Sequence, residues 1–140
     1  MKPDVAIAIL YQRDQFLLQL RDNVPNIAYP GHWGLFGGHI ELNESPELAV
    51  VRELQEEICY SVTDPVKFGV YDDDRATRHV FSAPLTVGVE ALTLIEGWDL
   101  GFFTRSDIQR GNRFSDRANQ IQPLGTIHQR ILLDFISANQ

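Results

Sequence analysis

The sequence predicts a mixed α/β fold, built as one domain over residues 1–140 around a single core. Two apolar runs, at residues 5–11 and 16–20, have the length and composition of buried strands. Two segments predict helices: residues 46–58, which begin at strong capping signals, and residues 127–135, where apolar side chains recur at helical spacing. A chain of 140 residues fits one such core and leaves little room for a second.

The remaining elements follow from turn-forming and apolar segments. The polar residues 12–15 join the first two runs as a hairpin, and prolines and glycines make residues 22–34 a loop. Residues 35–41 are expected to form two extended pieces around a glycine pair. Further along we expect two or three strands within 66–96 with a polar connection at 72–75, a short helix opening at 104–107, and a polar loop at 109–120.

The overall charge narrows the classes of function. The formal net charge is -7 and the sequence pI is about 4.9, which argues against a sequence-independent grip on a nucleic-acid polymer. A small anion can still be bound, because a metal ion reverses the local sign of a site. With Cys59 as its single cysteine and no apolar run of membrane-spanning length, the chain is expected to be a cytoplasmic protein.

The helix at 46–58 is the clearest local feature of the sequence. Ser45 suits the N-cap, Pro46 the first helical position, and Glu47 the first turn, where the helix dipole favours an anion. On a helical wheel the apolar side chains fall on one side and are expected to face a core; these are Val50, Val51, Leu54 and Ile58.

The opposite side of this helix carries three carboxylates. Glu53, Glu56 and Glu57 lie close together there, with Ala49 one turn before them leaving the surface open. Such neighbours repel one another, and no lysine follows one turn later to relieve the repulsion, since residue 61 is Ser. A hard cation such as Mg²⁺ would turn this repulsion into attraction. Taken alone, the pattern favours a solvated acidic helix face, since such clusters are common on exposed helices.

The spacing around these carboxylates distinguishes the two interpretations. Gly38 is followed after five residues by Glu44, and after seven more by Arg-Glu-Leu-Gln-Glu-Glu-Ile-Cys-Tyr at 52–60. This pattern resembles the box of the Nudix hydrolase family, and resembles MutT-like members in particular. Two positions depart from it: Cys59 replaces the final glycine, which predicts a different exit turn from the helix, and Phe36 replaces the usual proline.

The resemblance implies a fold and a catalytic apparatus. The implied fold is an α/β/α sandwich with a central mixed sheet and a loop-helix-loop. Mg²⁺, or Mn²⁺ in its place, would be held by the three glutamates with help from the Gly37 carbonyl. Glu53 would be the general base, with a residue from another loop as the alternative. Arg52 and Glu44 would pair and brace the loop against the helix, although an exposed Arg52 would be unremarkable on its own.

The resemblance also suggests substrate contacts. Arg21, Gly38, Arg78 and His79 are the candidates; an exposed strand-end arginine and an ordinary strand histidine are the competing interpretations. Glu96 is expected to be structural rather than a fourth metal ligand. Glu90 and the aspartates at 72–74 are weaker candidates for a ligand or base, the aspartates being expected to form a solvated turn. Trp33 and Phe36 are expected to pack in the core.

The family resemblance leaves the substrate open. We expect a nucleoside diphosphate linked to another moiety, foremost a nucleoside triphosphate or an oxidised nucleotide. A nucleoside-diphosphate sugar is the alternative. A domain that senses nucleotides without turnover is a third possibility, which the intact set of box glutamates disfavours. The partner is therefore a small molecule rather than a nucleic acid or a membrane, and the sequence does not decide whether the chain forms a homodimer.

Overall fold

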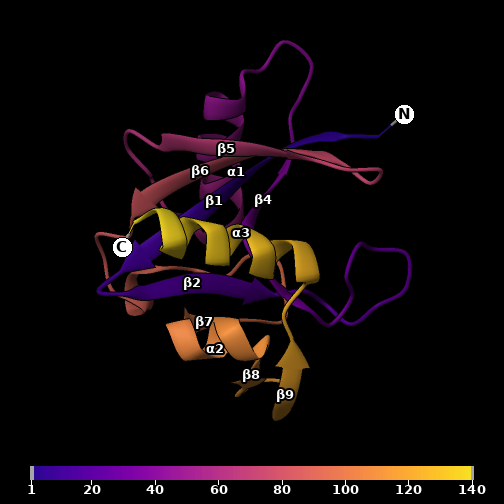
Figure 1. The fold of residues 1–140 in the computed structure, drawn as a ribbon, viewed down its shortest axis with the longest axis vertical. Coiled ribbons are helices and arrows are strands. Elements are labelled where there is room, and N and C mark those ends of the chain that lie inside the picture. The colour runs from indigo at the N-terminus through magenta and orange to yellow at the C-terminus, as the bar shows by residue number, and fades with distance from the viewer. Residues whose placement is uncertain (1, 140) are drawn as a thin grey trace. The chain divides into compact units, whose positions relative to one another are not determined.

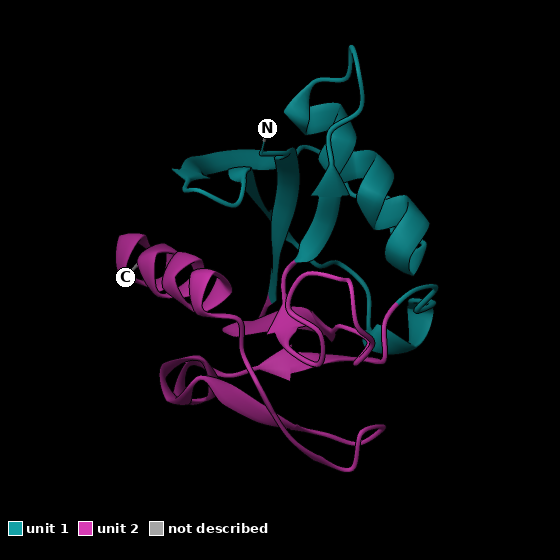
Figure 2. Cartoon of the chain, turned by 90° about the vertical axis from the view of Figure 1, so that its right-hand side faces the viewer, with its two compact units in different colours: residues 1–11, 36–96 teal, residues 12–35, 97–140 magenta. Residues whose placement is uncertain are grey.

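The computed structural model describes residues 2–139, which form two compact units (Figure 2). Unit 1 comprises residues 1–11 and 36–96, and unit 2 comprises residues 12–35 and 97–140. Each unit is thus assembled from two stretches of chain. The predicted single domain covers both of them and stays a prediction.

Unit 1 contains a mixed sheet, which Figure 1 shows beside helix α1. Its central strand β1 (Asp4–Gln12) pairs antiparallel with β4 (Phe36–His39) and parallel with β6 (Thr77–Pro84). Strand β5 (Val66–Asp72) pairs antiparallel with β6. The unit also holds α1 (Pro46–Ile58) and the single 3₁₀ turn η1 (Val89–Ala91). The predicted mixed α/β architecture is confirmed.

Unit 2 is built on β2 (Gln15–Leu20), which pairs antiparallel with β3 (Trp33–Gly34) and β7 (Asp99–Phe103). Strands β8 (Asn112–Ser115) and β9 (Gln120–Pro123) form a separate hairpin. The helices are α2 (Arg105–Arg110) and α3 (Thr126–Ala138). Thr104 caps α2 as its sequence suggests, its side chain accepting from the Asp107 N–H.

Two segments differ from the expectation. Residues 109–120 were expected to be a loop, but most of them belong to α2, β8 and β9, and the Ser115 hydroxyl on β8 donates to Asp99 on β7 at 2.7 Å. Strands β8 and β9 are short and rich in polar residues, without a regular apolar alternation. Residues 36–39 form one strand that runs through both glycines rather than two pieces.

Helix α1 begins and ends as its residues dictate. Its N-cap Ser45 accepts from the Leu48 N–H at 3.2 Å, and Pro46 opens the first turn. At the other end Cys59 adopts the left-handed conformation, with φ 55°. Cys59 therefore takes the backbone shape that glycine favours, so the expected different exit turn is wrong.

The packing of α1 also corrects the helical wheel. Val50, Leu54 and Ile58 are buried as predicted and Val51 is half-buried, but Ala49 and Glu57 are buried too. The acidic side is thus partly covered, because α1 packs against β4, whose glycines allow a close approach. No helix within residues 2–139 combines the length and apolar character needed to cross a membrane.

Candidate active site

The Glu53 carboxylate lies directly on the backbone of Gly38. A Cβ added to Gly38 would stand 2.6 Å from Cδ and Oε1 of Glu53, so no residue with a side chain fits there without a shift. The Glu53 side chain is only 15% exposed. This burial raises the pKa of Glu53, and the nearby charges of Glu56 and Glu96 raise it further, against the opposing effect of Arg52.

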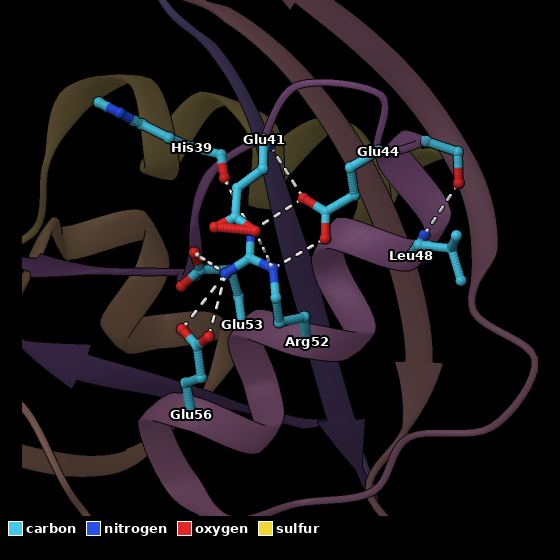
Figure 3. A network of polar contacts seen from close by, with 8 residues as sticks. His39, Glu41, Glu44, Leu48, Arg52, Glu53 and Glu56 are labelled. Atoms are coloured by element: carbon cyan, nitrogen blue, oxygen red, sulfur yellow. Dashed lines mark hydrogen bonds and ion pairs between the residues drawn. The ribbon is translucent and has the colours of Figure 1, made fainter.

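Arg52 joins the loop to the helix through every nitrogen of its guanidinium (Figure 3). Its Nε and Nη2 donate to the two oxygens of Glu44 at 2.7 and 2.9 Å. Its Nη2 also donates to the main-chain carbonyl of His39 at 3.0 Å. Its Nη1 donates to Glu53 at 3.1 Å and to Glu56 at 3.2 Å. The five N–H groups of an arginine can thus all be used here.

Glu44 is bound from two sides. Besides the fork from Arg52, its Oε1 accepts from the main-chain N–H of Glu41 at 2.9 Å, which closes the loop before the helix. The Arg52 guanidinium lowers the pKa of Glu44 to about 2, and the bond from Glu41 adds to this effect. Arg52 is correspondingly stabilised as a cation, and its pKa is raised.

Glu57 ties the helix to β4. Its Oε1 accepts from the main-chain N–H of Gly37 at 2.9 Å, and Glu57 is 7% exposed. Glu56, by contrast, has a side chain that is 58% exposed. Within residues 2–139 no three His, Cys, Asp or Glu side chains are gathered closely enough to hold a metal ion as they stand. The box glutamates instead share the donors of Arg52 and Gly37.

The donor set nevertheless fits a hard divalent cation in kind. It consists of carboxylates on one helix beside a glycine cradle, and one of them, Glu53, is poorly hydrated and close to the charges of Glu56 and Glu96. Oxygen ligands of this type are those that Mg²⁺ prefers. Glu53, Glu56 and Glu57 are therefore the residues that could hold Mg²⁺.

The register of the sheet separates the predicted substrate contacts of unit 1. Ala6 pairs with Gly38 on one side and His79 on the other, so His79 projects from the sheet face on which Glu53 covers Gly38. Arg78 projects from the opposite face, where its Nη1 donates to Asp73 at 2.9 Å. Gly38 and His79 thus share a face with the glutamates, and Arg78 does not.

Two predicted contacts have a buried nitrogen without a hydrogen-bond partner among the described residues. They are Nε of Arg21 and Nδ1 of His79. His79 also has its Nε2 3.6 Å from a carboxylate oxygen of Asp4. Arg21 belongs to unit 2, where it directly follows β2 and its main-chain N–H donates to His32.

The aspartate turn before β6 is exposed and has hydrogen bonds of its own. Asp73 accepts from the main-chain N–H groups of Arg75 and Ala76 and from Arg78. These bonds, the one from Arg75 first, lower the pKa of Asp73. Asp72 accepts from Lys2 and Thr77. Asp72, Asp73 and Asp74 are all exposed, so the expectation of a solvated turn is confirmed, and these bonds fix its shape.

Apart from the Gly37 carbonyl, the main-chain groups at the site were not predicted. The His39 carbonyl receives Arg52, and the Glu41 N–H is bound by Glu44. Any residue type supplies these groups, so no signal in the sequence points to them. The predicted core positions Trp33 and Phe36 are both fully buried.

Comparison with known proteins places this geometry in context. The NUDIX domain family matches residues 1–121. The chain is 34% identical over 84 residues to a putative 8-oxo-dGTP diphosphatase of Bacillus subtilis (strain 168), covering 59% of this chain and 52% of the relative. It is 44% identical over 50 residues to an 8-oxo-dGTP diphosphatase of Proteus vulgaris, covering 36% of this chain and 45% of the relative. The chain thus spans about half the length of these relatives.

Solved structures share the fold. A MutT NUDIX hydrolase from Burkholderia pseudomallei has a TM-score of 0.73 at 23% identity, covering 96% of this chain and 97% of its own. A MutT structure described for Aliivibrio salmonicida and Vibrio cholerae has a TM-score of 0.75 at 21% identity, covering 99% of both chains. The NUDIX domain of Shewanella oneidensis NrtR, complexed with ADP ribose, has a TM-score of 0.75 at 18% identity, covering 100% of this chain and 90% of its own. These likenesses confirm the predicted fold class.

Proposed function

Because the chain belongs to the Nudix hydrolase family, we propose that it hydrolyses a phosphoanhydride bond in a nucleoside diphosphate linked to another moiety, with Mg²⁺ as cofactor. This proposal rests on the hydrogen bonds that fix the loop before α1, and strand β4, to the helix. Arg52 links Glu44 to Glu53 and Glu56, while Glu57 is fastened to Gly37. The carboxylates of Glu53 and Glu57 are thereby held against Gly38 and Gly37 of β4.

Mg²⁺ would be held by Glu53, Glu56 and Glu57, with help from the Gly37 carbonyl. When bound, it supplies neutralisation of the diphosphate charge and lowers the pKa of water. The chain's own part is to place the carboxylates and to keep Glu53 partly desolvated. Mn²⁺ would satisfy the same oxygen ligands, which provides a useful second probe.

Glu53 is our candidate for the general base. Its Oε1 accepts from Arg52, which leaves Oε2 to accept a proton from the attacking water. Burial raises the pKa of this carboxyl, which brings it nearer to the range in which a base works well at neutral pH. A base from a loop outside the box is the alternative.

We propose nucleoside triphosphates as the substrates, oxidised ones included. The two relatives whose names specify 8-oxo-dGTP support this choice. Nucleoside-diphosphate sugars are the second candidate class. A third candidate, ligand sensing without turnover, has one observation in its favour: the NrtR domain of the same fold was solved with ADP ribose.

A substrate panel tests these alternatives. The purified chain would be incubated with 8-oxo-dGTP, the four dNTPs, two nucleoside-diphosphate sugars and ADP-ribose, with Mg²⁺ or with EDTA, and the released products quantified. We expect turnover that EDTA abolishes and a kcat/KM highest for a triphosphate. Highest kcat/KM for a sugar would favour the second class. Binding of ADP-ribose by calorimetry without turnover of any compound would favour the sensing role.

A further inference from the structure

The last turn of α1 receives two main-chain hydrogen bonds from a segment far along the chain. The Ile95 N–H donates to the Glu57 carbonyl at 2.9 Å, and the Thr93 N–H donates to the Ile58 carbonyl at 3.1 Å. The final carbonyls of a helix have no partner within the helix itself. Residues 93–95, which we call the strap, supply partners for two of them.

The other bonds at this helix end are local. The Cys59 N–H donates to the Gln55 carbonyl and the Tyr60 N–H donates to the Leu54 carbonyl. This is the usual pattern when an α-helix ends at a residue in the left-handed conformation. These bonds shape the turn but do not attach it to another part of unit 1. The strap is what attaches its main chain.

Glu57 is consequently held both through its side chain and through its main chain. Its side-chain Oε1 accepts from Gly37 at 2.9 Å and its main-chain carbonyl accepts from Ile95 at 2.9 Å. Glu57 is 7% exposed, so a shift of this turn would pull a buried carboxylate away from its donor. Leaving such a group without its bond is costly, and the two attachments therefore support each other.

The residue after the helix provides a second attachment to the same connection. The Tyr60 hydroxyl accepts from the Thr86 N–H at 3.1 Å and donates to the Pro84 carbonyl at 3.2 Å. Tyr60 is itself buried, at 7% exposure. The connection from Pro84 to Ile95 is thus bonded to the helix end both where it begins and where it finishes.

We infer that the strap is a positioning element, which holds the last turn of α1 in the place where Glu57 accepts from Gly37. Thr93 and Ile95 act through their main-chain N–H groups and do not touch the substrate. The catalytic consequence rests on the function proposed above, in which Glu57 helps to hold the metal. The structural consequence, protection of the Gly37 N–H, does not depend on that function.

Hydrogen exchange at the Gly37 amide tests the inference directly. Ile95→Pro and Thr93→Pro each remove one strap bond, and Leu94→Pro is the matched control, because the Leu94 N–H donates no hydrogen bond within the described residues. We expect the Gly37 amide to exchange at least about 10-fold faster in the first two variants, through local opening, and to stay within about 3-fold of wild type in the control. Equal rates in wild type and Ile95→Pro would overturn the inference, as would an equal acceleration in Leu94→Pro.

A second variant removes the Ile95 N–H without introducing a proline, which could misfold the segment. Replacing Ile95 by its α-hydroxy analogue exchanges only the N–H for an ester oxygen, so ring constraints play no part. The same acceleration at Gly37 is expected, and its absence counts against the strap.

Steady-state kinetics distinguish a failure of the strap inference from a failure of the proposed function. If the wild type turns over a nucleotide, Ile95→Pro should lower kcat while KM for the nucleotide changes less than about twofold, as expected when catalytic groups rather than substrate contacts are displaced. An unchanged kcat would overturn the catalytic part of the inference. A wild type without turnover would instead count against the proposed function, while the exchange at Gly37 still decides whether the strap positions Glu57.

Discussion

Arg52 donates hydrogen bonds to three carboxylates and one main-chain carbonyl, and this explains why arginine is suited to the position. Its planar fork matches the two oxygens of Glu44, and its remaining nitrogen reaches Glu53 and Glu56. A lysine has the charge but lacks the fork. The pairing of Glu44 with Arg52 therefore sets the direction in which the helix carboxylates are held.

The box glutamates are expected to be essential for the proposed reaction. Glu53→Gln and Glu57→Gln keep the size of each side chain and an oxygen that accepts from Arg52 or Gly37, but they remove the negative charge. We expect each to lower kcat by roughly 10²–10⁴-fold, the range for loss of an acid–base group, with an unchanged circular dichroism spectrum. The exposed Glu47→Gln is the control and should retain the wild-type rate. Near-normal rates in both box variants would contradict the assignment of these residues.

The Glu44–Arg52 pair should make stability depend on acid. The pKa of Glu44 is lowered to about 2 in the fold, whereas an unfolded glutamate titrates at about 4.3. A carboxylate whose pKa falls on folding stabilises the protein above its unfolded pKa, so this contribution is complete above about pH 5 and is lost as the pH falls towards about 2. Urea unfolding in EDTA should therefore show Glu44→Gln less stable than wild type at pH 7, with the difference shrinking between about pH 4.5 and 2. A difference that stays constant over this range would show that the charge of Glu44 is not what stabilises the loop.

Helix α1 is the element on which the local signals agree. Ser45 and Pro46 begin it, and the left-handed Cys59 ends it. Its placement, however, depends on β4, since Gly38 leaves the space that the Glu53 carboxylate fills. The helix thus forms from its own sequence, while its partners decide which of its side chains are buried.

The left-handed Cys59 should be a site of easy stabilisation. A non-glycine residue in this conformation is disfavoured by about 1–2 kcal/mol, and glycine relieves this cost while gaining freedom in the unfolded chain. We expect Cys59→Gly to raise the free energy of unfolding by about 0.5–1 kcal/mol, measured by urea denaturation. Cys59→Ala keeps the Cβ and should bring no such gain. Equal stability of the two variants would mean that the left-handed conformation is not costly at this position.

The whole chain combines two units, each made from two separated stretches, and the family match extends across both of them. The box, the strap and the connection from Pro84 to Ile95 all belong to unit 1. Arg21 belongs to unit 2, and its buried Nε has no hydrogen-bond partner within residues 2–139. The protein's thermal stability should report metal binding at the box.

Mg²⁺ is expected to raise the Tm, because a ligand that binds only the folded state stabilises it. At a concentration 100 times the Kd the gain is about 2.7 kcal/mol. Differential scanning fluorimetry with a Mg²⁺ series should show a rising Tm that EDTA reverses, and Glu53→Gln should reduce the shift strongly. A wild-type Tm that does not respond to Mg²⁺ or Mn²⁺ would count against the metal site.

Much of the fold was predictable where local patterns are strong. The runs at 5–11 and 16–20 are strands, and the segments at 46–58 and 127–135 are helices. The hairpin of β8 and β9 was not predicted, because its strands are short and rich in polar residues and pair through main-chain groups. A pattern based on apolar periodicity does not detect such a strand pair.

The sequence by itself determined the family and the residues of the box, because the spacing of Gly38, Glu44 and Arg52 to the glutamates is a linear property of the chain. Only the tertiary structure decided that Glu57 is buried on Gly37, that His79 and Arg78 leave the sheet on opposite faces, and that Ile95 holds the last turn of the helix. These facts rest on main-chain hydrogen bonds and on sheet register. Main-chain groups are nearly the same in every residue, so which of them meet is settled only when distant segments come together.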